Sequence, residues 1–299
     1  MLQIVDDNGL SELIQSDEAE RICTGFDFTE GPIWIPWDDC LLFTDIPLSR
    51  IHRWRPGWAE AEVYRDNSGN ANGLTLDHDG NLLACEHFNR RVSRAPYNGE
   101  VTSTIDRFEG RRFNSPNDLV VDRDGAIWFT DPNYGLTTRR MGDYGAPQEI
   151  PAQGVYRAAP DGTITRVAAT FTQPNGLTFS PDESLLYIND SHDGIIRRYP
   201  VQPNGTLTGG DLFVDMHDDP RPGGADGAKV DEAGRLWTTG AGGVWVIAPD
   251  GTRLGVLEID EVPANLCFGG PDFTTLYLTA RTSVYRVETT VRGIAPGSG

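Results

Sequence analysis

Six oxygen-bearing side chains recur at matching places along this sequence of 299 residues. Each one opens a similar phrase, in which an Asn, Asp or Glu is followed by an alternating strand pattern, a turn and a second strand rich in Leu, Ile or Trp. Carboxylate and amide oxygens are the ligands that a hard divalent cation such as Ca²⁺ prefers. The pattern therefore predicts one metal site, unless these residues only form Asx turns before each strand. The phrases start at Glu30, Asn72, Asn117, Asn175, Asp226 and Asn265.

The elements that would bring these residues together are the blades of a β-propeller. The phrase starts lie about 40 to 60 residues apart, which suits one four-stranded blade with its loops. Six phrases predict an all-β fold, with residues 1–299 forming a single six-bladed β-propeller of four-stranded antiparallel blades around a central channel. Because the first strand of each blade lines the channel, the residue at its start is expected at one mouth of the channel.

Two segments stand outside the repeat. Residues 1–22 precede the first phrase, and we expect this N-terminal extension to pack along the side of the ring or help to close it. Residues 135–153 lengthen the third unit with a polar segment that contains Gly and Pro. Long loops on a rigid scaffold are often functional, so this loop is a candidate wall or lid near the site, the alternative being a passive surface excursion.

Two kinds of X–Gly pair separate the predicted site from ordinary turns. Asp79–Gly80 and Asp124–Gly125 lie between two apolar strands, where a tight turn requires positive φ. By contrast, Asn72–Gly73, Asn175–Gly176 and Asp226–Gly227 precede the first strand of a hairpin. The phrase start is therefore not the hairpin turn.

Another set of polar residues falls at the ends of the second strands, which run back to the same mouth. Counting along each hairpin places Asp45, Glu86, Asp131 and Asn189 there. Two interpretations stay open. These residues could orient the amide ligands or contact a substrate, or they could only mark polar strand ends.

Composition limits the partners. The net charge is −19 with Lys229 as the only lysine, which excludes nucleic acid and argues against an anionic membrane, because both require clustered cations. The four cysteines show no metal-ligand spacing and are expected to be reduced core residues. We find no signal peptide and no run of 18 apolar residues, so we expect a soluble, cytoplasmic protein with no membrane partner. Motifs for acyl-enzyme, dinucleotide and nucleotide chemistry are absent.

Four segments resemble the gluconolactonase and regucalcin (SMP-30-like) family of six-bladed propellers, with more distant similarity to diisopropyl fluorophosphatase. They are FTEGPIW (28–34), NSPNDLVVDRDGAIWFTDPNYG (114–135), QPNGLTFSPDESLLYIND (173–190) and ADGAKVDEAGRLW (225–237). The resemblance extends from about residue 23 to about residue 286. It implies metal ligands at Glu30, Asn175 and Asp226, with Asn117 as either a fourth ligand or a substrate contact.

The resemblance also implies an activity: metal-dependent hydrolysis of a sugar lactone, a small-molecule substrate. One divalent cation is expected, Ca²⁺ first, with Zn²⁺, Mg²⁺ or Mn²⁺ as alternatives. Asp226, both ligand and acid, is the expected catalytic base. Organophosphate or phosphotriester hydrolysis on the same site, or a calcium-binding propeller without turnover, are the alternatives, and the oligomeric state stays open. Substrate contacts are expected from Asn72, His87, Arg90, Asn117 and Tyr134.

Overall fold

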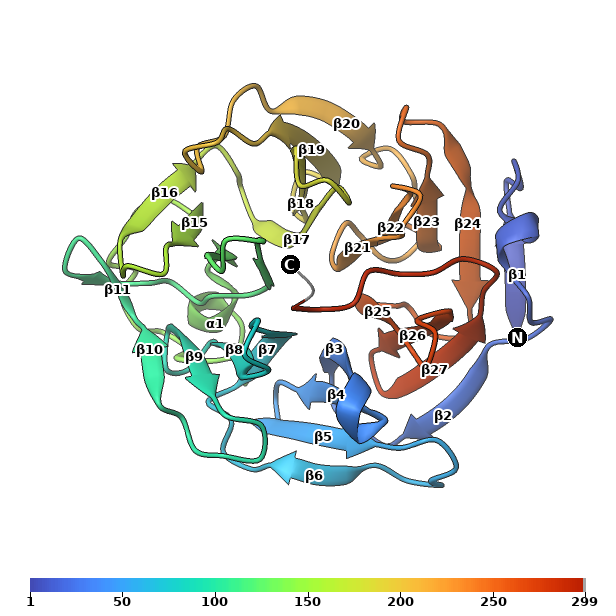
Figure 1. Cartoon of the computed structure of the whole chain (residues 1–299), viewed down its shortest axis with the longest axis horizontal. Coiled ribbons are helices and arrows are strands. Elements are labelled where there is room, and N and C mark those ends of the chain that lie inside the picture. The colour runs from blue at the N-terminus through green and yellow to red at the C-terminus, as the bar shows by residue number, and fades with distance from the viewer. Residues whose placement is uncertain (298–299) are drawn as a thin grey trace.

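The computed structural model describes residues 1–297, in which six antiparallel sheets stand around a central channel (Figure 1). This arrangement confirms the predicted all-β six-bladed propeller. In each blade the first strand lies at the channel and the last at the rim. Blade 1 contains β3 (Thr29–Ile35), β4 (Cys40–Asp45), β5 (Arg50–Trp54) and β6 (Glu62–Arg65). Blade 2 contains β7 (Ala71–Leu76), β8 (Leu82–Glu86), β9 (Arg91–Ala95) and β10 (Ser103–Ile105). Blade 3 contains β13 (Leu119–Val121), β14 (Ile127–Asp131), β15 (Gly154–Ala158) and β16 (Ile164–Ala168).

The second half of the chain continues the same pattern. Blade 4 contains β17 (Pro174–Phe179), β18 (Leu185–Asp190), β19 (Ile195–Pro200) and β20 (Asp211–Asp215). Blade 5 contains β21 (Ala228–Val230), β22 (Leu236–Gly240), β23 (Gly243–Ile247) and β24 (Arg253–Ile259). Blade 6 contains β25 (Asn265–Gly269), β26 (Thr275–Ala280) and β27 (Ser283–Glu288). Outside the blades are the hairpin β11 (Arg107–Phe108) and β12 (Arg111–Arg112), the helix α1 (Tyr134–Thr137) and the 3₁₀ turns η1 (Ser11–Leu13) and η2 (Pro36–Asp38).

The N-terminal segment completes the ring. Strand β2 (Glu20–Thr24) pairs antiparallel with β27 and becomes the outer strand of blade 6. Strand β1 (Leu2–Val5) pairs with β24 and adds a fifth strand to blade 5. Segments from the two ends of the chain therefore pair within one sheet, which closes the ring between the first and last blades.

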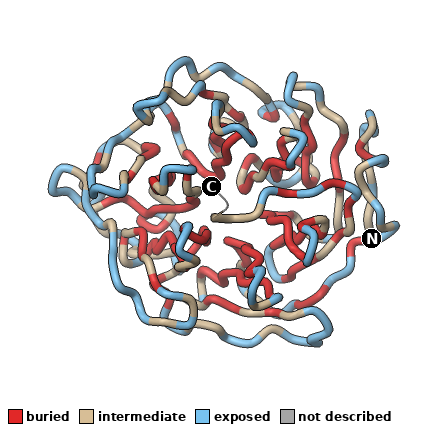
Figure 2. The backbone as a smooth tube through the Cα atoms, in the orientation of Figure 1, coloured by how far each residue is buried: buried red, intermediate tan, exposed pale blue. Residues whose placement is uncertain are grey.

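Apolar packing between the blades holds the ring together. Buried positions concentrate on the inner strands, while exposed positions follow the rim and the connecting loops (Figure 2). Trp34, Trp128 and Trp237 are among the largest fully buried side chains. The indole N–H groups of Trp128 and Trp237 donate to Asp122 and Asp231 at 2.8 and 3.0 Å, which satisfies their only polar atom.

The two mouths of the channel differ. Over one mouth lies the C-terminal segment, and its residues 294–297 line an apolar cavity with the far ends of the inner strands (Figure 1). The four cysteines are buried and free, as expected. Within residues 1–297 the helices are too short or too polar to cross a membrane.

Candidate functional site

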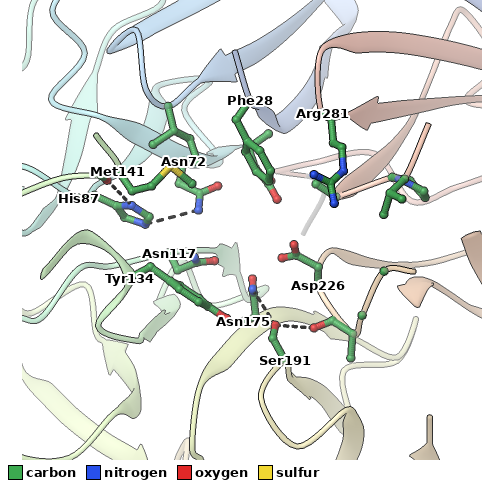
Figure 3. Close-up of a pocket in the computed structure, with 18 residues that line it drawn as sticks. Phe28, Asn72, His87, Asn117, Tyr134, Met141, Asn175, Ser191, Asp226 and Arg281 are labelled. Carbon is green, nitrogen blue, oxygen red and sulfur yellow. Dashed lines mark hydrogen bonds between the residues drawn. The ribbon is translucent and has the colours of Figure 1, made fainter. Parts of the chain in front are cut away.

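The phrase starts gather at the other mouth of the channel. A cavity of about 230 Å³ opens there, and its lining includes all but one of the predicted site residues (Figure 3). The structure thus brings together the four proposed metal ligands. Three of the predicted substrate contacts, from blades 2 and 3, line the same cavity. The predicted residues that line the cavity are Glu30, Asn72, His87, Asn117, Tyr134, Asn175 and Asp226.

Glycine allows the inner strands to approach one another at this mouth. A Cβ on Gly176 would lie 2.1 Å from the carbonyl oxygen of Asp226, and one on Gly31 would lie 2.0 Å from that of Asn72. The Gly176 amide donates to the same Asp226 oxygen at 3.0 Å. Gly176 does not have a positive φ, so a turn does not explain why glycine occupies this position. Glycine is required there because the two blades approach each other closely. Gly73 and Gly227 make equivalent approaches to the next blade.

Glu30 and Asp226 are the two acids of the cavity. Glu30 Oε2 accepts hydrogen bonds from the Gly31 amide at 2.8 Å and from Asn265 Nδ2 at 2.9 Å. Burial raises the pKa of both carboxyls, and the negative charge of Glu30 raises the pKa of Asp226 further. Across residues 1–297 neither acid forms an ion pair with an Arg, Lys or His side chain. Lys229 lowers the pKa of Glu30 without pairing with it. A bound divalent cation would supply the direct counter-charge that the two acids lack.

Asn175 is oriented by a short chain of hydrogen bonds. Its Nδ2 donates to Ser191 Oγ at 2.9 Å, and Ser191 Oγ donates to the carbonyl oxygen of Ala225 at 2.5 Å. Burial raises the pKa of the Tyr134 hydroxyl to about 12, although the side chains of Ser191 and Asn175 lower it. With the amide nitrogen engaged, the carbonyl oxygen of Asn175 is the atom available to a cation.

Asn72 is oriented from blade 2 and from the long loop. His87 is fully buried, and its Nδ1 lies 2.9 Å from the carbonyl oxygen of Met141, so Nδ1 carries the proton. Its Nε2 then accepts from Asn72 Nδ2 at 3.4 Å (Figure 3). Burial lowers the pKa of His87 to about 4, so the ring is neutral. This arrangement leaves the side-chain amide oxygen of Asn72 facing the cavity.

The loop 135–153 forms one wall of the site. Met141 lines the cavity, while Arg140 pairs with Asp27 on blade 1 and its carbonyl oxygen accepts from Asn70 at 3.1 Å. The loop thus reaches from blade 3 across blade 2 to blade 1. These contacts favour the interpretation of the loop as a wall of the site.

Arg90 was predicted to contact the substrate, but it does not line the cavity. Its side chain is 1% exposed, Nε donates to the carbonyl oxygen of Phe113 at 2.7 Å, and NH1 lies 3.8 Å from Glu149. The sequence placed Arg90 near the mouth because it follows a second strand. In the structure its side chain instead lies beside Glu149, near the end of the long loop, and so connects this loop to blade 2.

The strand-end acids are also outside the cavity lining. Asp45 accepts from the amides of Asp27 and Phe28, and Asp131 accepts from those of Asn114 and Ser115. In blade 4 the turn between β17 and β18 is one residue longer than the turn between β7 and β8 in blade 2, so the equivalent residue is Asp190 rather than Asn189. The interpretation as scaffold is therefore the one that the hydrogen bonds support.

Asn189 and Asn265 support the two cavity acids from behind. Asn189 Nδ2 donates to the carbonyl oxygen of Asp226 at 2.6 Å and to Thr238 at 2.9 Å. Asn265, the sixth phrase start, does not line the cavity, because its amide donates to Glu30. Both side chains fix the backbone or carboxylate of a proposed ligand.

Several lining residues escaped the sequence analysis because they lie on loops outside the repeated phrases. The register could have indicated Ile46, Ser191 and Arg281, because each directly follows the second strand of its blade. Nothing in the repeat indicates Phe28 or Met141. The missed residues include Phe28, Ile46, Met141, Ser191 and Arg281.

The donor set favours a hard cation over a thiolate or imidazole site. In the described part of the chain no group of three or more His, Cys, Asp and Glu side chains could hold a metal ion. The cavity instead offers two carboxylates with the amide oxygens of Asn117 and Asn175. Oxygen donors of this kind fit Ca²⁺, Mg²⁺ or Mn²⁺ better than a soft metal.

Comparison with known proteins agrees with the fold. The SMP-30/Gluconolactonase/LRE-like region matches residues 28–282. The chain is 32% identical over 300 residues to Gluconolactonase from Zymomonas mobilis, covering 93% of this chain and 83% of the relative. It is 29% identical over 257 residues to Pentonolactonase XacC from Haloferax volcanii, covering 84% and 80%. A solved gluconolactonase structure from Xanthomonas campestris has a TM-score of 0.88 and 31% identity, covering 96% of this chain and 94% of that one. The chain therefore belongs to the SMP-30/gluconolactonase/LRE-like family.

Proposed function

We propose that this protein is a metal-dependent lactonase that opens a sugar lactone by attack of water on the ring carbonyl. One observation carries the proposal. Glu30 is buried and Asp226 is half-buried in one cavity together with Asn117 and Asn175, and neither acid has a cationic side-chain partner among the described residues. The names of the relatives, gluconolactonase and pentonolactonase, support the choice of a lactone as substrate.

Glu30, Asn117, Asn175 and Asp226 would hold one divalent cation, with Ca²⁺ as our first choice. When bound, such a cation supplies a Lewis acid that polarises the lactone carbonyl and stabilises negative charge on its oxygen. Asn117 alternatively contacts the substrate directly. The remaining chemistry falls to side chains of the protein.

Asp226 is the proposed general base. Its carboxylate accepts no backbone hydrogen bond in residues 1–297, unlike that of Glu30, so it is the freer of the two acids to take a proton from water. Asn72 and Tyr134 present polar atoms to the sugar hydroxyls, and the loop segment around Met141 keeps bulk water from one side of the cavity. The roles follow from which polar atoms face the cavity.

The test begins with metal analysis of the purified protein. Proton release is then followed with a pH indicator on five- and six-membered sugar lactones and on a phosphotriester. We expect lactone hydrolysis that stops after chelation and returns when one of Ca²⁺, Mg²⁺, Mn²⁺ or Zn²⁺ is added. The Glu30→Gln protein serves as the background, because lactones also hydrolyse spontaneously.

Each contrary outcome has its own meaning. Full activity after verified metal removal would overturn the metal dependence. Turnover of the phosphotriester but of no lactone would favour the organophosphatase alternative. Metal binding and thermal stabilisation without hydrolysis of any ester would indicate a binding protein.

A further inference from the structure

Arg281 is a charged residue of the cavity that the proposed mechanism does not use. It lies in the turn between β26 and β27, and its guanidinium projects into the cavity between Phe28 and Asp226 (Figure 3). Asp and Glu outnumber Lys and Arg by 44 to 25 in this chain, so acids are plentiful. Nevertheless, within residues 1–297 the guanidinium of Arg281 makes no hydrogen bond and no ion pair.

The charge of Arg281 is not used to neutralise the cavity acids. Burial, Glu30 and Asp118 raise the pKa of Asp226, and Arg281 does not contribute to that shift. His87, the other basic side chain of the lining, is neutral because its pKa is lowered to about 4. Once a divalent cation balances the two carboxylates of the lining, Arg281 is the remaining charged side chain among the lining residues.

The backbone around Arg281 is fixed in an uncommon conformation. Arg281 and Thr282 form a two-residue hairpin loop, with Ala280 paired to Ser283. Arg281 has φ +48°, a region that favours Gly, and it is the only non-glycine lining residue with positive φ.

Hydrogen bonds on both sides hold this loop in place. The Thr29 amide donates to the Arg281 carbonyl oxygen at 2.7 Å, and the amide of Thr282 donates to Glu261 at 3.0 Å. The backbone that carries Arg281 is thus fixed, while the residue itself is exposed at the rim of the cavity. Strain retained at a ligand site is reason to suspect a function for the residue.

We infer that Arg281 binds an anionic group on the substrate, so that the preferred lactone carries a carboxylate, sulfonate or phosphate away from the ring carbonyl. This inference rests on the proposed lactonase function. A guanidinium forms paired hydrogen bonds with such groups, whereas amides such as Asn72 suit neutral hydroxyls. The unpaired guanidinium and its position in the cavity lining both favour an anion.

The experiment compares matched lactones on the metal-loaded protein. Gluconolactone is measured beside the same lactone phosphorylated on its terminal carbon, and beside the analogue oxidised there to a carboxylate. We expect kcat/KM to be about tenfold higher for the anionic lactones, mainly through KM. Arg281→Gln should abolish this preference, and Arg281→Lys should keep part of it.

Arg21→Gln is the matched control. Arg21 is an exposed arginine on β2, at the rim, so the variant changes the net charge equally without touching the cavity. It should keep the ratio between anionic and neutral lactones. If this ratio fell by a comparable amount in the Arg21→Gln protein, the overall charge of the protein would explain the preference, and the inference would be overturned. Thermal melts of all three variants check that they are folded.

Binding separates this inference from the lactonase proposal. Calorimetry measures the affinity of wild type and Arg281→Gln for gluconate phosphorylated on its terminal carbon. If lactones are hydrolysed without an anion preference, the role of Arg281 is overturned and the lactonase stands. If no lactone is hydrolysed but the anion binds wild type at least tenfold more tightly than the variant, the anion site stands and the lactonase fails. Failure of both measurements overturns both.

Discussion

Two sets of polar side chains lie near the same mouth of the channel, and they differ in how many hydrogen-bond partners the protein gives them. The inner set begins the first strands and includes Glu30 and Asp226, whose carboxylates have few protein donors. The outer set ends the second strands, as Asp45 and Asp190 do, and each of these acids accepts several backbone amides. Polar atoms that the protein leaves without partners are those available to a ligand.

The outer set works as a repeated structural device. In blades 1, 3 and 4 the carboxylate accepts from the two amides that lie three and two residues before the inner-set residue of the same blade. It therefore fixes the chain just before each proposed ligand enters its strand. The three residues are Asp45, Asp131 and Asp190.

The largest expected difference is in catalysis by the inner set. Asp226→Asn should lower kcat/KM for a sugar lactone by about a thousandfold, because the amide cannot take a proton from water. The free energy of unfolding of the metal-free protein should not fall, since the change removes a buried charge that Glu30 repels. Stopped-flow proton release and urea unfolding measure the two quantities. Full activity in this variant would exclude Asp226 as the base.

Glycine offers the next comparison, between an inner-set position and a turn. Gly176→Ala should lower the free energy of unfolding by about 3 kcal/mol, because the new methyl group would meet the backbone of Asp226. Gly162, at φ +87° with open space around it, is the control, and Gly162→Ala should cost about 1 kcal/mol from backbone strain alone. Chemical denaturation compares the two variants. Equal losses would mean that the blades can separate at no cost.

His87 directly follows Glu86 at the end of a second strand, yet its ring hydrogen bonds to Asn72 of the inner set. Because its pKa is lowered by burial, His87 predicts a pH dependence of stability. Its pKa is about 4 when folded and 6.5 as a free side chain, so the unfolded chain binds the proton first as the pH falls. The stabilisation from the neutral ring is complete above about pH 6.5 and is lost toward pH 4. Between pH 7 and pH 5 it should amount to about 2 kcal/mol. Between pH 7 and pH 5, the change in the free energy of unfolding should be less favourable in wild type than in His87→Gln by this amount, because carboxyls with a raised pKa such as Glu30 contribute equally to both proteins. Urea unfolding of both proteins at both pH values measures this difference.

The smallest effect is expected from the outer set. Asp45→Asn should lower the free energy of unfolding by about 1.5 kcal/mol, because an amide nitrogen would face a backbone N–H of the entering chain. Catalysis per folded molecule should change less than tenfold. A thousandfold loss, as in Asp226→Asn, would erase the distinction between the two sets.

The repeat made most of the site predictable. Six phrases in register place Glu30, Asn117, Asn175 and Asp226 at one mouth, since a propeller brings the starts of its inner strands to one axis. Arg90 was misplaced because strand order does not reveal which way a side chain turns after its strand ends. Asp190 was missed by one residue, because the turn before its strand is one residue longer than in blades 2 and 3.

The sequence by itself determined the number of blades and the residues that face the axis, because strand alternation and turn spacing are local properties that repeat along the chain. The tertiary structure alone decided which polar atoms are left without partners. Ser191, Met141 and Arg281 reach the cavity from loops of three different blades, and only packing of those blades brings them together. Contacts between distant segments depend on the whole ring, so no single segment encodes them.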